Sequence, residues 1–176
     1  MKSEPSWKPT ANAASPLPVV YLKECHAVLK RDKIHIRPML SGDLAAVVDL
    51  ERRIFPYPWN KQDFMSEISI PDGFSCIAEN SRIIMGYLCA RQMADGMEIL
   101  KIASHPAYRK KGVATLLMGK TYQKAGESQW PVLFLEVACK NTEALSFYRS
   151  QGFIPSGIRK GYYPDGTDAM NMMKHL

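Results

Sequence analysis

The sequence lacks several patterns that would each point to a particular class of protein. It has no apolar run of membrane-spanning length and no apolar N-terminal stretch of the signal-peptide kind. The pattern G-x-x-x-x-G-K-S/T is absent, and no G-x-G-x-x-G follows a strand-like run. These absences exclude a nucleoside-triphosphate P-loop and a dinucleotide fingerprint. We expect a cytoplasmic protein with no membrane partner.

Cysteine and concentrated positive charge are also scarce. The four cysteines, Cys25, Cys76, Cys89 and Cys139, are widely separated and form no C-x-x-C pair. We therefore predict reduced, packed thiols and no metal site. The net charge of +6 is moderate, and no long Lys/Arg run carries interleaved aromatic residues, so we expect no direct contact with nucleic acid.

What is present is the composition of an ordinary globular protein, with 46% hydrophobic and 23% charged residues. A chain of 176 residues is long enough to bury one sizeable core, which predicts a single domain. Four prolines fall within the first eighteen residues, separated mainly by small and polar residues. We expect residues 1–33 to form an N-terminal extension or arm and residues 34–176 to form the folded domain.

The most informative stretch runs from Glu98 to Leu117. A short apolar run ends at His105-Pro106, three basic residues lead into Gly112, and apolar residues then recur at helical spacing. This order predicts a strand, a basic turn and a helix. Glycine lets the backbone approach a ligand, and the first N–H groups of a helix attract anions. We predict a cradle for a phosphate or pyrophosphate, with Lys101 among the cations around it.

The residues at 132–138 predict a strand that is apolar on both faces except for Glu136. Such a carboxylate is partly desolvated, which suits it to act as a general base. The alternative is a glutamate at a splayed sheet edge that pairs with a nearby lysine.

Two aromatic features accompany this strand. Asn141 caps a predicted helix at 142–150, and Tyr148 lies on the helix face that looks back toward the strand of Glu136. Tyr148 is either a functional hydroxyl or a core aromatic residue. The Phe-Pro-Tyr-Pro-Trp run at 55–59 cannot continue a helix, because its prolines interrupt the backbone hydrogen bonds. It makes either a substrate wall or a lid on the core.

The pattern Arg109-x-x-Gly112-x-Ala114 resembles the Q/R-x-x-G-x-G/A motif of the GNAT superfamily of N-acetyltransferases, which holds the pyrophosphate of coenzyme A. Within the superfamily the chain is most similar to the RimI type of ribosomal-protein N-terminal acetyltransferase and to its archaeal relatives. Four stretches carry the resemblance in the expected order: Pro58-Trp59 with Phe64; Ile102 to Thr115; Leu135-Glu136-Val137 through Asn141 to Tyr148-x-x-x-Gly152-Phe153; and Arg159 to Tyr163 followed by Asp168-Ala169.

The resemblance implies an α/β fold of the GNAT type, a single domain with a central mixed, mostly antiparallel sheet flanked by helices. It implies that acetyl-CoA donates an acetyl group to the N-terminal α-amine of a protein or peptide, a ribosomal protein being one candidate, by direct attack on the thioester. Two alternatives stay open. The acceptor could be a lysine or a small amine, or the chain could bind coenzyme A without catalysis.

The resemblance also assigns roles to single residues. Glu136 matches the proton acceptor and Tyr148 the proton donor. Four residues match the positions that surround the incoming peptide end, namely Pro58, Trp59, Tyr162 and Tyr163. The positions that match coenzyme A contacts are Ile102, Ala103, Ser104, Arg109, Lys110, Lys111, Gly112, Val113, Ala114, Thr115 and Asn141. The family often has Val in place of Ser104 and Gly in place of Ala114, which are small changes in a site built from backbone groups.

Overall fold

The computed structural model describes residues 34–71 and 73–176. The extension expected at 1–33 lies outside these residues. The elements, in chain order, are β1 (His35–Pro38), η3 (Ser41–Asp43), α1 (Leu44–Ile54), α2 (Lys61–Ile68), β2 (Phe74–Asn80), β3 (Ile83–Met93), β4 (Gly96–Ser104), η4 (Pro106–Tyr108), α3 (Val113–Glu127), β5 (Val132–Ala138), α4 (Thr142–Ser150), β6 (Ile154–Arg159) and β7 (Ala169–His175).

The strands and helices that the sequence predicts between Glu98 and Ser150 are confirmed. β5 and α4 have the bounds that the sequence predicts, and the Asn141 side chain accepts a hydrogen bond from the Ala144 N–H at 3.1 Å, as a helix cap does. The strand, basic turn and helix around Gly112 are β4, the loop at 105–112 and α3.

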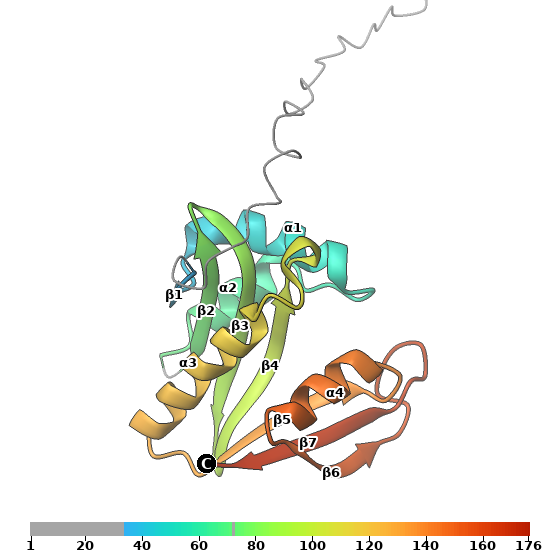
Figure 1. Cartoon of the computed structure of the whole chain (residues 1–176). Coiled ribbons are helices and arrows are strands. Elements are labelled where there is room, and N and C mark those ends of the chain that lie inside the picture. The colour runs from blue at the N-terminus through green and yellow to red at the C-terminus, as the bar shows by residue number, and fades with distance from the viewer. Residues whose placement is uncertain (1–33, 72) are drawn as a thin grey trace, which may run out of the picture.

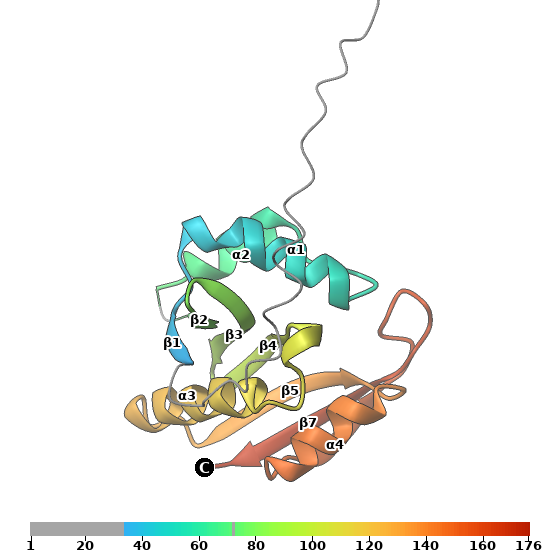
Figure 2. The same cartoon turned by 45° about the horizontal axis from the view of Figure 1, so that its top comes forward.

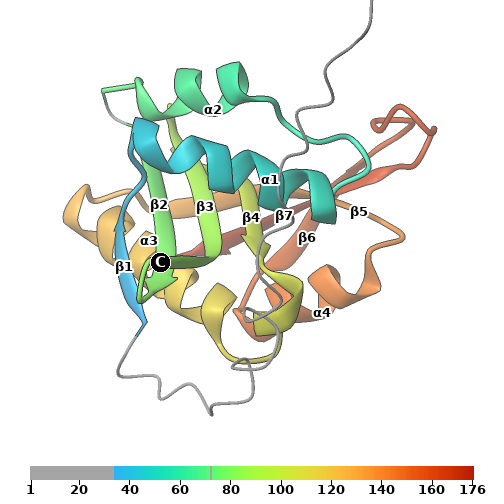
Figure 3. The same ribbon diagram turned by 90° about the horizontal axis from the view of Figure 1, so that it is seen from above.

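The sheet has seven strands in the order β1-β2-β3-β4-β5-β7-β6. Among the described strands β4 and β5 form the single parallel pair, and all other neighbours are antiparallel. Figure 3 shows α1 and α2 on one face of the sheet and α3 and α4 on the other. The sheet is therefore mixed, mostly antiparallel and flanked by helices, as expected.

Each face of the sheet has its own core. Under α1 and α2 the buried side chains include Leu44, Val47, Phe64, Ile77, Tyr87 and Ala103. Under α3 and α4 they include Leu88, Leu117, Met118, Leu133, Leu135, Val137, Tyr148 and Phe153. The central strands β2 and β3 bury both faces. In β5 the face toward α4 is buried at Leu133, Leu135 and Val137, whereas the opposite face is only half-buried from Phe134 onward.

Three of the four cysteines fall within the described residues, and all three are free thiols. Cys76 and Cys89 are buried in the sheet, and this burial raises the pKa of each thiol to about 12. They behave as small apolar side chains. Cys25 lies outside the described range.

The sheet splits between β4 and β5. These strands pair only where Met97, Glu98 and Ile99 meet residues 133–135. Beyond that point β4 stays with β3 and β5 stays with β7, so the two halves diverge, as Figure 1 shows. The register of β3 with β4 also shifts at Leu100, because Ala90 pairs with Ile99 and Cys89 with Lys101. This bulge lies where the split begins, and it reverses which side chains of β4 face α1.

Candidate active site

A cleft of about 1000 Å³ opens at the split in the sheet. Its walls come from β4, the start of α3, β5 with α4, the α1–α2 loop and the β6–β7 loop. The two loops face each other across it, as Figure 2 shows, at the end where β4 and β5 diverge. Every residue to which the sequence assigned a site role lines this cleft except Lys111 and Pro58. Lys111 lies near the Tyr108 ring, 5.4 Å from its centroid, and Pro58 is exposed beside Trp59.

The turn before α3 has the backbone shape of an anion cradle. Lys110 has a φ of +58° and Gly112 a φ of +84°, so both residues adopt the left-handed backbone conformation. Turns with such residues direct successive backbone N–H groups toward their concave side, where an anion can bind. The helix that follows adds its own free N–H groups. Its first residue packs closely on β3, because a Cβ at Gly86 would lie 2.8 Å from Val113 Cγ1. Gly112 therefore permits the backbone conformation of the cradle, and Gly86 permits the close packing of α3 on β3 that positions it.

The diverging part of β4 offers a second set of backbone groups. The carbonyl of Ala103 faces β3, since a Cβ at Gly86 would lie 2.5 Å from it, and the His105 N–H donates to Met85 on β3 at 2.8 Å. Backbone groups alternate along a strand, so those of Ile102 and Ser104 face the open edge toward the cleft. An extended ligand with amide groups can pair with this edge.

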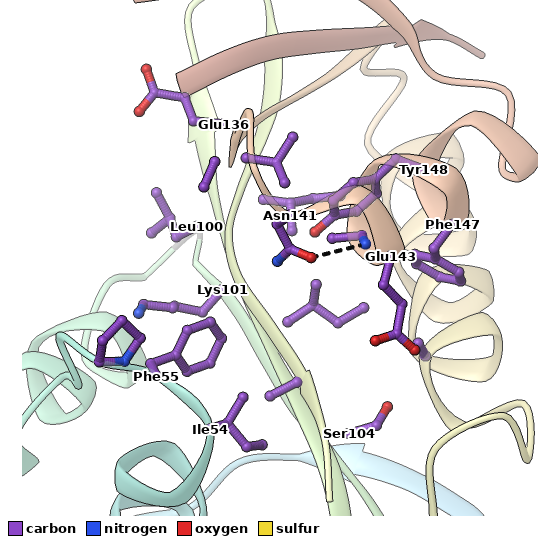
Figure 4. Close-up of a pocket in the computed structure, with 18 of the residues that line it drawn as sticks. Ile54, Phe55, Leu100, Lys101, Ser104, Glu136, Asn141, Glu143, Phe147 and Tyr148 are labelled. Atoms are coloured by element: carbon purple, nitrogen blue, oxygen red, sulfur yellow. Dashed lines mark hydrogen bonds between the residues drawn. The ribbon is translucent and has the colours of Figure 1, made fainter. Parts of the chain in front are cut away.

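Glu136 and Tyr148 approach the cleft from opposite faces of the sheet. Leu135 and Val137 belong to the core under α4, so Glu136, which lies between them, faces the α1 side. Figure 4 shows Glu136 and Lys101 on one side of β4, and Tyr148 directed toward Asn141 on the other. As predicted, the face of α4 that carries Tyr148 packs toward β5. It packs, however, on the side of β5 opposite to the Glu136 side chain.

The carboxylate of Glu136 is partly buried, with its side chain 21% exposed, and it is paired. Its Oε1 lies 3.2 Å from Nη1 of Arg159 on β6, so its partner is an arginine rather than the nearby lysine considered from the sequence. A hydrogen bond with Glu136 is the main reason that the pKa of Tyr162 rises to about 12. Arg159 also lies over the Tyr162 ring, 4.5 Å from its centroid. Glu136 thus stands at the centre of a polar cluster.

Tyr148 is buried between aromatic rings. Its ring centroid lies 5.5 Å from that of Phe147 and 5.8 Å from that of Phe153. Burial raises the pKa of Tyr148 above its ordinary value, so the hydroxyl stays protonated at neutral pH and can donate a hydrogen bond. The Tyr148 ring belongs to the core, as one interpretation of the sequence expects, and the residue also lines the cleft. The functional role of its hydroxyl stays a prediction.

Two charged features of the cleft were missed or misread from the sequence. Lys101 does not stand free for a phosphate, because its Nζ lies 2.9 Å from Oε1 of Glu51, a fully buried residue of α1. The helical spacing of Glu51 from Val47 and Val48 could have revealed that it faces the core. Glu98 also lines the cleft, and burial followed by repulsion from Glu136 raises its pKa. Glu98 reaches the cleft because β4 pairs with β5, and a local sequence pattern does not reveal which strands pair.

A scan against protein-family models matches residues 44–153 to the acetyltransferase (GNAT) family. The chain belongs to the GNAT family. It is 31% identical to a Bacillus subtilis (strain 168) protein assigned to the ribosomal protein bS18-alanine N-acetyltransferases, over 81% of this chain and 95% of that protein. The crystal structure of the ribosomal-protein-S18-alanine N-acetyltransferase from Escherichia coli superposes with a TM-score of 0.75 at 25% identity, covering 81% of this chain and 94% of the other. The archaeal Ard1 from Thermoplasma volcanium shares the fold, with a TM-score of 0.75 at 21% identity over 82% and 98% of the two chains.

GNAT acetyltransferases use acetyl-CoA as their acyl donor, and this protein is one of them. The cleft fits this molecule, because the left-handed turn before α3 suits a pyrophosphate and the open edge of β4 suits an amide-bearing arm. Within residues 34–71 and 73–176, no group of three or more His, Cys, Asp or Glu side chains is placed to hold a metal ion. No helix in the same residues is both long and apolar enough to cross a membrane.

Proposed function

We propose that the protein transfers an acetyl group from acetyl-CoA to the α-amine of a protein N-terminus, with a ribosomal protein as the target. The observation that carries the proposal is the division of the cleft by the split sheet. The anion cradle and Tyr148 lie toward one face, whereas Glu136 with its partner Tyr162 and the α1–α2 loop lie toward the other. Donor and acceptor can therefore enter from opposite faces and meet between β4 and β5.

In this proposal the residues of the cleft have separate binding and catalytic roles. The turn at Arg109–Gly112 and the start of α3 bind the phosphates, with Asn141 as a further contact, and Ile102 and Ser104 hold the arm through backbone groups. Bound acetyl-CoA supplies an activated acetyl group in the form of a thioester. Glu136, directly or through a water, accepts a proton from the amine. The N–H groups of the open β4 edge polarise the acetyl carbonyl, and the Tyr148 hydroxyl hydrogen-bonds the departing sulfur.

The chemistry favours an α-amine over a lysine side chain. The amine must be neutral to attack, and the reference pKa values are about 7.8 for an α-amine and about 10.4 for lysine. Deprotonating lysine therefore costs roughly 3.5 kcal/mol more at the same pH. The names of the relatives, which specify alanine N-acetyltransferases of a ribosomal protein, support a protein N-terminus as the acceptor.

The test is coenzyme A release from acetyl-CoA in the presence of a short peptide that begins with alanine and contains one lysine. The matched control is the same peptide with its α-amine blocked. Release with the free peptide alone supports the proposal. Coenzyme A release with both peptides would indicate lysine acetylation. Release with neither peptide would indicate that the acceptor is a small amine.

A further inference from the structure

Glu51 is a fully buried carboxylate that the proposed reaction does not use. It accepts three hydrogen bonds from three different elements. The donors are the backbone N–H of Trp59 at 2.9 Å, the Lys101 ammonium at 2.9 Å and the Tyr87 hydroxyl. A buried charge is tolerated only when it is paired and hydrogen-bonded. Glu51 therefore ties the α1–α2 loop to β3 and β4 at a single point.

Lys101 extends this connection to the aromatic side chains of the loop. Its Nζ lies 4.1 Å from the Phe55 ring centroid and 5.3 Å from the Trp59 ring centroid. Figure 4 shows Lys101 and Phe55 side by side at the edge of the cleft. Trp59 in turn packs edge-on against Phe64 at 5.3 Å, and Phe64 against Tyr87 at 5.4 Å. The ion pair and the rings thus form one closed network around Glu51.

We propose that the Glu51–Lys101 ion pair positions the aromatic wall of the acceptor side, formed by Phe55 and Trp59, for the incoming peptide end. This inference rests on the proposed function. Both residues are positioning residues, because they hold the loop and do not take part in proton transfer. A preformed wall spares the acceptor the entropic cost of ordering these side chains when it binds. The anion cradle lies elsewhere in the cleft, on the turn before α3, so the ion pair affects the acceptor and not acetyl-CoA.

The test compares the wild-type protein with the double variant Glu51→Gln/Lys101→Met. The glutamine amide oxygen can still accept from the Trp59 N–H, the amide NH2 group can donate to the Tyr87 hydroxyl oxygen, and no buried charge is left unpaired. We expect the KM for the alanine peptide to rise about tenfold, because the wall must be ordered on binding. The kcat and the KM for acetyl-CoA stay within about twofold, and the Trp59 backbone amide exchanges with solvent about tenfold faster.

The matched control is Glu67→Gln/Arg91→Met. This pair also joins a helix, α2, to a strand, β3, but neither residue lines the cleft. The control variant should keep the wild-type KM for peptide. An unchanged peptide KM in the Glu51/Lys101 variant, or an equal rise in both variants, would overturn the positioning role. Should the wild-type protein fail to acetylate the peptide, the proposed function falls, and Trp59 amide exchange alone decides whether the ion pair holds the loop.

Discussion

Glu98 and Glu136 lie on the same face of the sheet, on the two parallel strands that separate to form the cleft. Glu98 is in register with Phe134, so Glu136 stands two residues further along β5, toward the split. Burial raises the pKa of Glu98, and repulsion from Glu136 adds to the shift. The two carboxylates differ in position, because Glu136 lies beyond the last β4–β5 pair and Glu98 lies within the paired region.

The position of Glu136 predicts that it, and not Glu98, is the proton acceptor. We expect Glu136→Gln to lower kcat by about 100-fold or more and Glu98→Gln to lower it by less than about tenfold. Steady-state kinetics of both variants at saturating acetyl-CoA make the comparison. The reverse order of effects would assign the proton transfer to Glu98.

Tyr148→Phe should lower kcat by about 100-fold, because one hydrogen-bond donor to the leaving sulfur is lost. Its ring contacts with Phe147 and Phe153 persist, so the melting temperature should hardly change. The KM for acetyl-CoA should rise by less than kcat falls. An unchanged kcat in this variant would refute the role of the hydroxyl.

Gly112→Ala should weaken binding of acetyl-CoA. A φ of +84° is strained by about 1 kcal/mol for a residue with a Cβ, so the cradle would lose its shape. We expect the KM for acetyl-CoA to rise severalfold while the KM for the peptide stays constant. Gly119→Ala is the control, since this exposed position within α3 has nothing within 4 Å of an added Cβ. That variant should leave both KM values unchanged and stabilise the fold by about 0.5–1 kcal/mol.

The β6–β7 loop is tied to the turn before α4 by an ion pair between Asp165 and Lys140. This pair lowers the pKa of Asp165 from its ordinary value of 3.8 to about 2. A lowered carboxyl pKa stabilises the folded loop above pH 3.8, and the contribution is lost as the pH falls toward 2. In Lys140→Met, NMR titration should show the Asp165 pKa moving up toward 3.8. Lys160→Met, which removes the partner of Asp168 instead, should leave the pKa of Asp165 in place.

The sequence by itself determined the elements around the cleft and the basic turn between β4 and α3. Proline and glycine positions, apolar periodicity and the basic turn are local properties, so they predicted β5, α4 and the turn at Arg109–Gly112 directly. Glu136 stood out as the single carboxylate of an apolar strand. The resemblance to the GNAT family then implied a mixed, mostly antiparallel sheet and the roles of proton acceptor for Glu136 and proton donor for Tyr148.

Only the tertiary structure decided how these parts meet. The bulge at Leu100 and the end of β4–β5 pairing at Ile99 depend on contacts between segments far apart in the chain. The same holds for the ion pairs of Glu136 with Arg159 and of Glu51 with Lys101, which join residues 23 and 50 positions apart. A charged residue in a sequence does not reveal its partner, because the partner is chosen by packing and burial in three dimensions.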